Sequence, residues 1–321
     1  MVDDPNSSIT CRSRSPYWLE DGSLILLSHC DLYKVHKTLL LRHSPTLATW
    51  ISQFHDVLPT IHQHFIPQFA GCTFVKVPDD IGLRNEDLEA LLEHLYHDVP
   101  LSCEAPFSRI ASVLRASSPK QLNFPAVHEL SVKCISTLFP SGPRPFLHPD
   151  CLQEALMLAT EYNLPIRKGL LYSIVTTSNF DTESDEIHAS TLSEAPSQNN
   201  NLDLPSTMSI WPSTDTLSPI DVQRCQRLMG GMMEHFTPIL FTPATTPHMA
   251  CTDVFADMWM SVVIQPALQN SGVYKPLETL QNIIDIDWGK LGLCLSCVTE
   301  KRAEWSREQE CIWEKIDKWI D

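Results

Sequence analysis

The stretch Leu24-Ile-Leu-Leu-Ser-His29, followed by Leu32-Tyr-Lys-Val35, decides the fold of the first part of the chain. The turn residues Asp21-Gly22 precede the first apolar run, and a polar break at Asp31 separates it from the second. Two short apolar runs joined by so few residues are typical of a β-hairpin. We therefore expect a small sheet to begin here.

Helical spacing follows the hairpin. Leucines from Leu39 to Leu47 predict a helix or a helix pair, interrupted at Ser44-Pro45. Cys72-Thr-Phe-Val-Lys-Val77 predicts a third strand. Asn85 is a good N-cap for a helix that ends near Tyr96, and helical spacing returns over 127–139 and 152–162. The predicted class is α+β, a small sheet covered by helices.

Composition divides the 321 residues into parts. No Lys or Arg occurs between Gly169 and Gln223, a stretch rich in Ser, Thr, Asn, Pro and acidic residues, which is typical of a disordered linker. The last part carries five of the eight tryptophans, enough apolar bulk for an all-helical second core. We expect a flexible tail at 1–15, a folded domain at 16–105, a helical extension at 106–177, an acidic linker at 178–219 and a helical C-terminal domain at 220–321.

The net charge of −16 disfavours non-specific binding to nucleic acid, because the phosphate backbone is also negative. No apolar run is long enough to cross a membrane, and the first residues lack the pattern of a signal peptide. The odd number of cysteines, 11, favours reduced thiols over a disulfide framework. We expect an intracellular protein of the cytoplasm or nucleus, with protein partners and with no nucleic-acid or membrane partner.

The order of elements and several motifs together resemble the BTB (POZ) domain. The residues that carry the resemblance are Tyr17-Trp-Leu-Glu-Asp-Gly-Ser-Leu-Ile-Leu-Leu27, the stretch from Tyr33 to Pro45 with its Val35-His36-Lys37 and Ser44, Val77-Pro-Asp79, and the leucine-rich helix that closes at Tyr96. The continuation, with Asn123-Phe-Pro-Ala-Val127 and Glu154 to Tyr162, is similar to BTB proteins of mushroom-forming fungi. The long segment 56–71 and Leu47, which replaces an aromatic residue, depart from the family pattern.

The resemblance implies a module that self-associates as a homodimer or holds a scaffold, such as a cullin of a ubiquitin ligase. By position, Asp21, His36 and Lys37 would lie near the dimer seam. A carboxylate of one subunit opposite an ammonium of the other would satisfy a two-fold interface. The alternatives are that Asp21 is a turn residue, that Lys37 flanks a buried helix, and that His36 caps a backbone group.

A second candidate site lies in the last part of the chain. Cys294-x-x-Cys297 has the spacing of a zinc-chelating pair, and His248-x-x-Cys251 offers the two further ligands that a tetrahedral site needs. Cys225 and His235 are looser alternatives as ligands. If the helix of Trp259 packs antiparallel to the last helix, their starts lie apart; if a third helix at 277–284 intervenes, the starts can meet. Reduced cysteines without metal are the competing interpretation.

The motifs of hydrolases, nucleotide-binding loops and zinc proteases are absent from the sequence. We therefore expect a protein-interaction module that is not an enzyme and needs no cofactor other than a zinc ion at the Cys/His set. Two alternatives stay open: a zinc-binding C-terminal unit with a structural or catalytic role, and a transcriptional regulator that acts through protein contacts.

Overall fold

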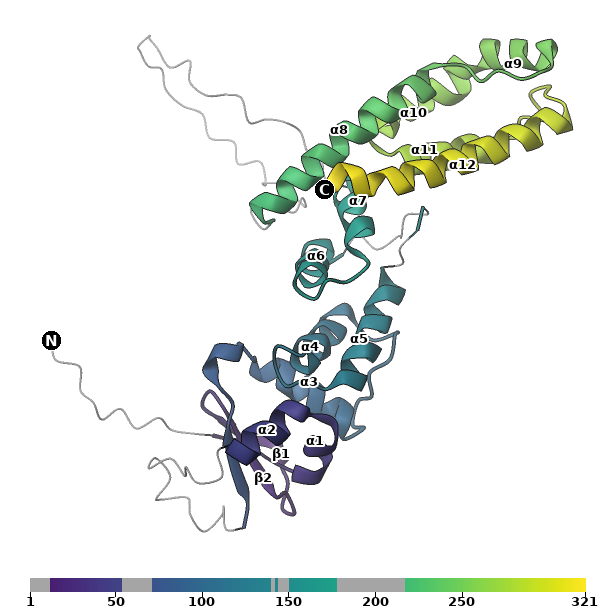
Figure 1. The fold of residues 1–321 in the computed structure, drawn as a ribbon. Helices are drawn as coiled ribbons and strands as arrows, with labels where there is room; N and C mark the ends of the chain where they lie inside the picture. The colour runs from purple at the N-terminus through teal and green to yellow at the C-terminus, as the bar shows by residue number, and fades with distance from the viewer. Residues whose placement is uncertain (1–11, 54–70, 140–141, 144–149, 178–216) are drawn as a thin grey trace, which may run out of the picture. The chain divides into compact units, whose positions relative to one another are not determined.

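A computed structural model describes residues 12–53, 71–139, 142–143, 150–177 and 217–321. The chain divides into two compact units, Met1–Leu138 and Phe139–Asp321. Figure 1 shows the helices and strands of each unit. The predicted tail up to residue 11 and nearly all of the predicted linker, 178–216, lie outside the described residues.

The first unit contains a mixed four-stranded sheet in the order β1-β3-β2-β4. The predicted hairpin is formed by the antiparallel pair β2 and β3, and the predicted third strand, β4, pairs parallel to β2. The expectation of a mixed α and β fold with a small sheet is confirmed. The strands are β1 (Arg12–Trp18), β2 (Leu24–Ser28), β3 (Asp31–Val35) and β4 (Thr73–Lys76).

Burial on both faces explains why β2 is the central strand. All of its residues are buried, so both alternating sets of side chains are covered, as in the inner strand of a sheet. Leu26 lies opposite both Tyr33 of β3 and Val75 of β4. The left-handed conformation of His29 (φ 51°) allows a tight turn between β2 and β3. The His29 side chain also contacts the segment before α3, with its Nε2 2.9 Å from the carbonyl oxygen of Leu83.

The strand β1 corrects the prediction of a flexible tail up to residue 15. Residues 12–18 form an edge strand parallel to β3, with an irregular register between Ser13 and Trp18. The segment Arg-Ser-Arg-Ser-Pro has no alternation of apolar and polar side chains, so its pattern does not predict a strand. Its anchor is Tyr17, which is buried and donates a hydrogen bond to Asp98 (3.3 Å).

The helices of the first unit begin immediately after the hairpin. The predicted interruption is confirmed at Ser44, a buried residue between α1 and α2 whose hydroxyl donates to the carbonyl of Leu122 (2.5 Å) and accepts from the Leu47 N–H (3.0 Å). The elements are α1 (Lys37–His43), α2 (Pro45–Gln53), the short 3₁₀ helix η3 (Asp79–Ile81), α3 (Asn85–Leu95), α4 (Phe107–Ser117) and α5 (Pro125–Leu138).

The prediction that Asn85 is an N-cap is wrong by one residue. Arg84 is the N-cap of α3, without a side-chain capping bond, and Asn85 is the first helical residue. The Asn85 amide instead donates to Asp31 (2.6 Å), while its oxygen accepts from Ser28 (2.8 Å). Asn85 therefore fastens the start of α3 to the hairpin.

The second unit is helical in its described residues. The predicted extension at 106–177 is divided between the units: α4 and α5 belong to the first, whereas α6 and α7 belong to the second. Tyr172 of α7 is buried and its hydroxyl bonds to Glu278 (2.5 Å). The elements are α6 (Leu152–Glu161), α7 (Arg167–Thr177), α8 (Pro219–Phe241), α9 (Met249–Trp259), the π-helical turn η5 (Met260–Ile264), α10 (Gln265–Gln269), η6 (Gly272–Tyr274), α11 (Pro276–Asp285) and α12 (Leu295–Ile320).

An aromatic cluster forms the core of the second unit. Phe255 and Trp288 have ring centroids 4.8 Å apart, and Trp259 stacks on Trp288 at 6.1 Å. Trp305 of α12 closes the cluster at 5.9 Å from Trp288. The indole N–H of Trp259 donates to the carbonyl of Leu240 (2.8 Å), so this buried polar group is satisfied.

Candidate metal centre

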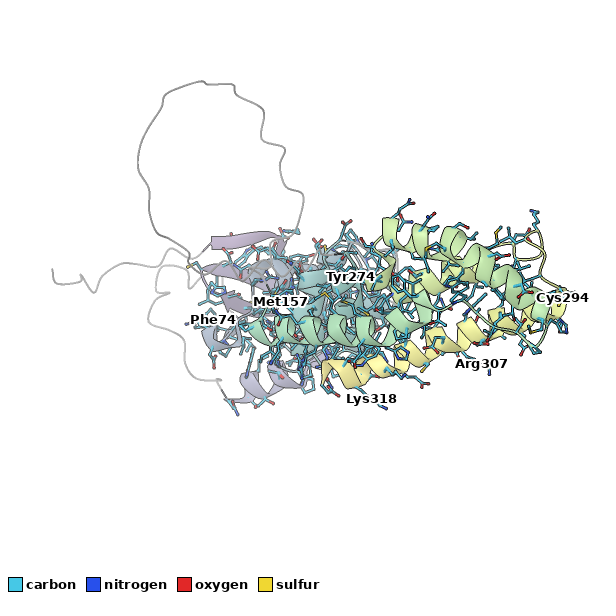
Figure 2. All side chains as sticks on the ribbon, turned by 90° about the horizontal axis from the view of Figure 1, so that it is seen from above. Phe74, Met157, Tyr274, Cys294, Arg307 and Lys318 are labelled. Atoms are coloured by element: carbon cyan, nitrogen blue, oxygen red, sulfur yellow. The ribbon has the colours of Figure 1, made fainter. Side chains whose placement is uncertain are left out.

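The four predicted metal ligands of the second unit lie together. The Nδ1 of His248 and the Sγ atoms of Cys251, Cys294 and Cys297 are all within 4.8 Å of one another. The His248 Nδ1 lies 3.2 Å from the Cys294 Sγ and 3.5 Å from the Cys297 Sγ. Figure 2 shows Cys294 at the start of α12, far from Lys318 at its other end.

The path of the chain explains how distant residues meet. The helical run α9, η5 and α10 leads away from His248, and α11 leads back. The chain then enters α12 beside the start of α9, as Figure 1 shows. A returning helix was one of the two geometries that the sequence left open, and it is the one that occurs, with α11 at Pro276–Asp285.

Both ligand pairs occupy the same positions at the N-terminus of a helix. His248 is the N-cap of α9, and Cys251 is the third residue of that helix. Cys294 is the N-cap of α12, and Cys297 is its third residue. Because N-cap and third-residue side chains converge over the first turn, each three-residue spacing brings two ligand atoms to one point. Backbone N–H groups at these helix ends also favour negative charge on the sulfur atoms.

The loop before α9 is fixed by two threonines, Thr246 and Thr252, that were not among the predicted site residues. The Thr246 hydroxyl donates to the carbonyl of His248 (3.0 Å), and the Thr246 N–H donates to the hydroxyl of Thr252 (2.9 Å). These bonds hold the backbone of His248 in the extended conformation of an N-cap (φ −93°, ψ 116°). The pattern Thr-Thr-Pro-His, which places hydroxyls just before a helix start, is the signal that could have indicated it.

The two cysteines of α12 differ in their electrostatic surroundings. The backbone N–H of Cys297 and the side chain of His248 lower the pKa of Cys294 to about 6. Burial raises the pKa of Cys297 above that of an ordinary thiol. At neutral pH Cys294 is therefore the thiolate of the pair, which is the form that binds metals and reacts with electrophiles.

The donor set fits one tetrahedral ion. Zinc–sulfur bonds of about 2.3 Å and zinc–nitrogen bonds of about 2.0–2.1 Å place ligand atoms about 3.5–3.8 Å apart. The separations of 3.2 and 3.5 Å between the His248 nitrogen and the two sulfur atoms of α12 are close to this range, and all four ligand atoms lie within 4.8 Å of one another. Four protein ligands fill a tetrahedron, so the arrangement leaves no position for a substrate.

The looser alternatives lie elsewhere. Cys225 is buried in α8. His235 forms a second group with Glu308 and Cys311, but its Nε2 lies 2.7 Å from Glu308 and its Nδ1 lies 3.2 Å from the Lys315 ammonium. Both ring nitrogens are thus engaged, and a lysine cation stands where a metal would approach. This group is better described as a polar contact between α8 and α12.

No known protein family, curated protein or solved structure matches the chain. Within the described ranges, no helix combines the length and apolar character needed to cross a membrane.

The predicted interface residues lie at one end of the sheet of the first unit. This end is where Leu24 of β2 pairs with both Val35 of β3 and Thr73 of β4. The residues that follow Val35 therefore lie there. His36 Nε2 lies 3.0 Å from the exposed Asp21 carboxylate, and the Lys37 ammonium donates to the Thr73 hydroxyl (3.1 Å). The His36 N–H donates to the Tyr96 hydroxyl (2.9 Å). The hydrogen bond from His36 holds the pKa of Asp21 below its usual value.

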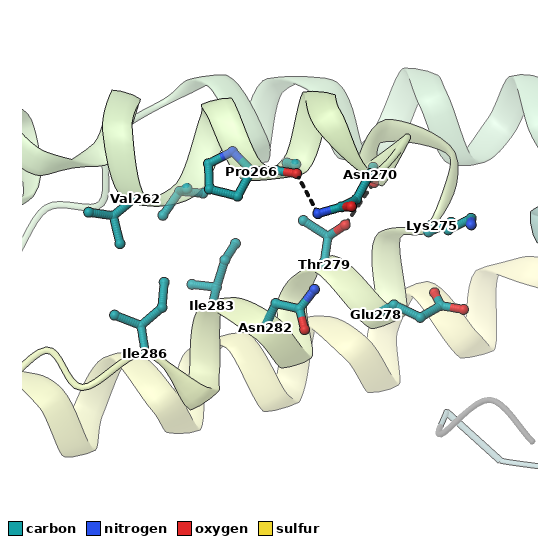
Figure 3. Close-up of a pocket in the computed structure, with 12 residues that line it drawn as sticks. Val262, Pro266, Asn270, Lys275, Glu278, Thr279, Asn282, Ile283 and Ile286 are labelled. Atoms are coloured by element: carbon teal, nitrogen blue, oxygen red, sulfur yellow. Dashed lines mark hydrogen bonds between the residues drawn. The ribbon is translucent and has the colours of Figure 1, made fainter. Parts of the chain in front are cut away.

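A pocket of about 430 Å³ lies between the η5–α10 segment and α11 (Figure 3). Val262 and Pro266 face Ile283 and Ile286 across it, as Figure 3 shows. Three of the polar side chains that line it are bonded within the unit: Asn270 donates to the carbonyl of Pro266 (2.9 Å), Thr279 donates to that of Gly272 (2.9 Å), and Glu278 accepts from the Tyr172 hydroxyl (2.5 Å). The hydrogen-bonding groups of these three side chains are therefore engaged in contacts that hold the unit together.

Proposed function

We propose that the chain is a protein-interaction protein, not an enzyme, whose first unit resembles a BTB domain and joins two copies of the chain. Holding a scaffold protein, for example a cullin, is the alternative use of the same unit.

The strand arrangement carries the proposal. A hairpin, a helix pair that turns at Ser44, and a strand that returns beside the hairpin form one sheet between Leu24 and Val77. This is the order of elements on which the resemblance depends. In the described sheet, β1 and β4 are edge strands, and edge strands offer backbone groups to another chain.

The charges at the end of the sheet support a two-fold contact. The side chain of Asp21 is 80 % exposed and keeps free lone pairs beside its bond to His36. Lys37 is the first residue of α1 and follows His36 directly in the chain. A two-fold axis near this end would bring each carboxylate toward the ammonium of the other copy, and each contact would occur twice.

Light scattering on the intact chain tests self-association. We expect a mass of twice 36.3 kDa at high concentration, falling toward one chain on dilution. A single-chain mass at every concentration would contradict the dimer. Co-purification with a cullin, tested on the same preparation, would then support the scaffold alternative.

Charge reversal tests the position of the seam. Asp21→Lys or Lys37→Asp alone should weaken the dimer, and the double variant should restore much of the affinity if the two groups meet across the axis. Glu104→Lys is the matched control, because Glu104 is an exposed carboxylate in the loop after α3. Equal weakening by Glu104→Lys would show a general charge effect instead.

A further inference from the structure

We propose that His248, Cys251, Cys294 and Cys297 hold one structural Zn²⁺ ion, which fastens the start of α9 to the start of α12. The main evidence is that these four residues, which come from two segments far apart in the sequence, place their ligand atoms within 4.8 Å of one another.

The ligand chemistry selects the ion. Thiolate and imidazole ligands suit Zn²⁺, whereas Mg²⁺ and Ca²⁺ prefer oxygen. A complete set of four protein ligands is typical of structural zinc sites, since catalytic sites keep a position for water or substrate. The structural role is therefore favoured over the catalytic one.

The burial of the ligands agrees with a structural role. Cys251 and Cys297 are buried, Cys294 is partly exposed, and His248 is exposed. The ion would thus lie at the end of the unit, with its inner side against the core and its histidine toward solvent. An ion can reach such a site without unfolding the chain, and a chelator can remove it.

The ion would close a long loop. Cys251 and Cys294 are separated by 42 residues, which include α10 and α11. Cross-linking the ends of such a segment restricts the unfolded chain more than the folded one, so it favours folding. Because the ligands are not assembled in the unfolded chain, the free energy of metal binding adds to stability.

Along both α9 and α12, residues of the aromatic cluster follow the metal ligands toward the C-terminal end of the helix. Phe255 is one turn after Cys251, and Trp305 is two turns after Cys297. Trp288 belongs to the connection that leads from α11 to Cys294 and is fully buried. Loss of the ion should loosen this connection, so the near-ultraviolet circular dichroism of the tryptophans should change.

The first test is the metal content of the intact chain purified under reducing conditions without chelator. We expect one equivalent of zinc per chain, removable with a strong chelator and restored by ZnCl₂. Replacing zinc by Co²⁺ should give the visible bands of a tetrahedral ion together with sulfur-to-cobalt charge transfer. A chain that retains no zinc after incubation with ZnCl₂ and desalting would overturn the proposal.

Variants identify the ligands. Cys294→Ser/Cys297→Ser should lose the zinc, whereas Cys30→Ser/Cys151→Ser should keep it, because both of those cysteines are exposed and lie outside the cluster. His248→Ala should bind zinc at least about tenfold more weakly, and His248→Cys should restore binding with stronger charge-transfer bands in the cobalt form.

The outcomes separate the metal from the alternative of free thiols. If Cys294→Ser/Cys297→Ser does not fold, the cobalt spectra of the wild-type chain and of His248→Cys decide. Equal zinc in the wild type and in the Cys294/Cys297 double variant would overturn the assignment, as would a cobalt form without sulfur-to-cobalt charge transfer. Zinc content and cobalt spectra do not depend on self-association. The zinc proposal can therefore be contradicted while the proposed dimer is supported, and the dimer can be contradicted while the zinc proposal is supported.

Discussion

Asp87 links two helices of the first unit through a buried charge. Its carboxylate is fully buried between Arg84 of the α3 cap and Arg115 of α4, with nitrogen–oxygen distances of 3.0 Å to each guanidinium. Burial acts to raise the pKa of Asp87, but the hydrogen bonds from Arg115 and Arg84 outweigh it and hold the pKa below its usual value. The pair of guanidiniums thus keeps a charge inside the unit.

Arg115→Met should lower the free energy of unfolding of the first unit by about 1.5–3 kcal/mol, the range for a hydrogen bond to a charged group. Arg84→Met should cost less, because the Arg84 side chain is 55 % exposed and that of Arg115 only 15 %. Urea denaturation of both variants checks the order. Equal losses, or a greater loss for Arg84→Met, would contradict the ranking.

The lowered pKa of Asp87 also predicts how stability depends on pH. A carboxyl group whose pKa is lower in the folded state contributes stability above its unfolded pKa, near 4, and loses that contribution as the pH falls through its folded pKa. The wild type should therefore lose stability in this acidic range, and Asp87→Asn should show a flatter acid limb. The measurement is the urea midpoint of both proteins from neutral pH into this acidic range. If the midpoints of the two proteins fall by the same amount, Asp87 is not the group responsible.

At the scale of elements, periodicity in the sequence predicted most of the helices and strands. It predicted the hairpin, β4 and α3, because their apolar residues recur at the period of each structure. It missed β1, which is held by pairing with β3 and not by its own apolar pattern. The four metal ligands were predictable from their spacing, but their meeting was not, because it depends on the direction in which α11 returns.

The contact between α8 and α12 depends on one glycine. A Cβ on Gly231 would lie 2.5 Å from the Trp319 ring, whereas nothing lies within 4 Å of a Cβ on the adjacent Gly230. Gly231→Ala should therefore destabilise the second unit by about 1–3 kcal/mol through overpacking. Gly230→Ala should be neutral or stabilise it by up to about 1 kcal/mol, since alanine favours a helix. Thermal melts of the pair test this, and equal melting temperatures would contradict it.

The last helix should be indispensable to its unit. Trp305, Ile312, Ile316 and Ile320 of α12 are buried, and Trp305 completes the aromatic cluster. Burial of such side chains contributes roughly 1.5–3 kcal/mol each, so the loss of all four is comparable to the whole stability of an ordinary domain. A chain that ends at Glu304 should have an unfolded second unit; unchanged helicity and melting would contradict this.

At the scale of the whole molecule, two compact units each have their own core. We therefore expect two thermal transitions for the intact chain. If the zinc assignment holds, a chelator should lower the transition that carries the near-ultraviolet tryptophan signal and leave the other unchanged. Scanning calorimetry with and without chelator measures this, and a shift of both transitions by the same amount would contradict a site confined to the second unit.

The repeated use of N-cap and third-residue positions has a consequence for evolution. One residue inserted between His248 and Cys251, or between Cys294 and Cys297, would rotate a ligand by about 100° around its helix and remove it from the cluster. The 42 residues between Cys251 and Cys294 can change in length, provided that they still bring Cys294 back beside Cys251. Descendants of this chain should therefore conserve His-x-x-Cys and Cys-x-x-Cys while the length between them drifts, a signature by which distant homologues can be sought.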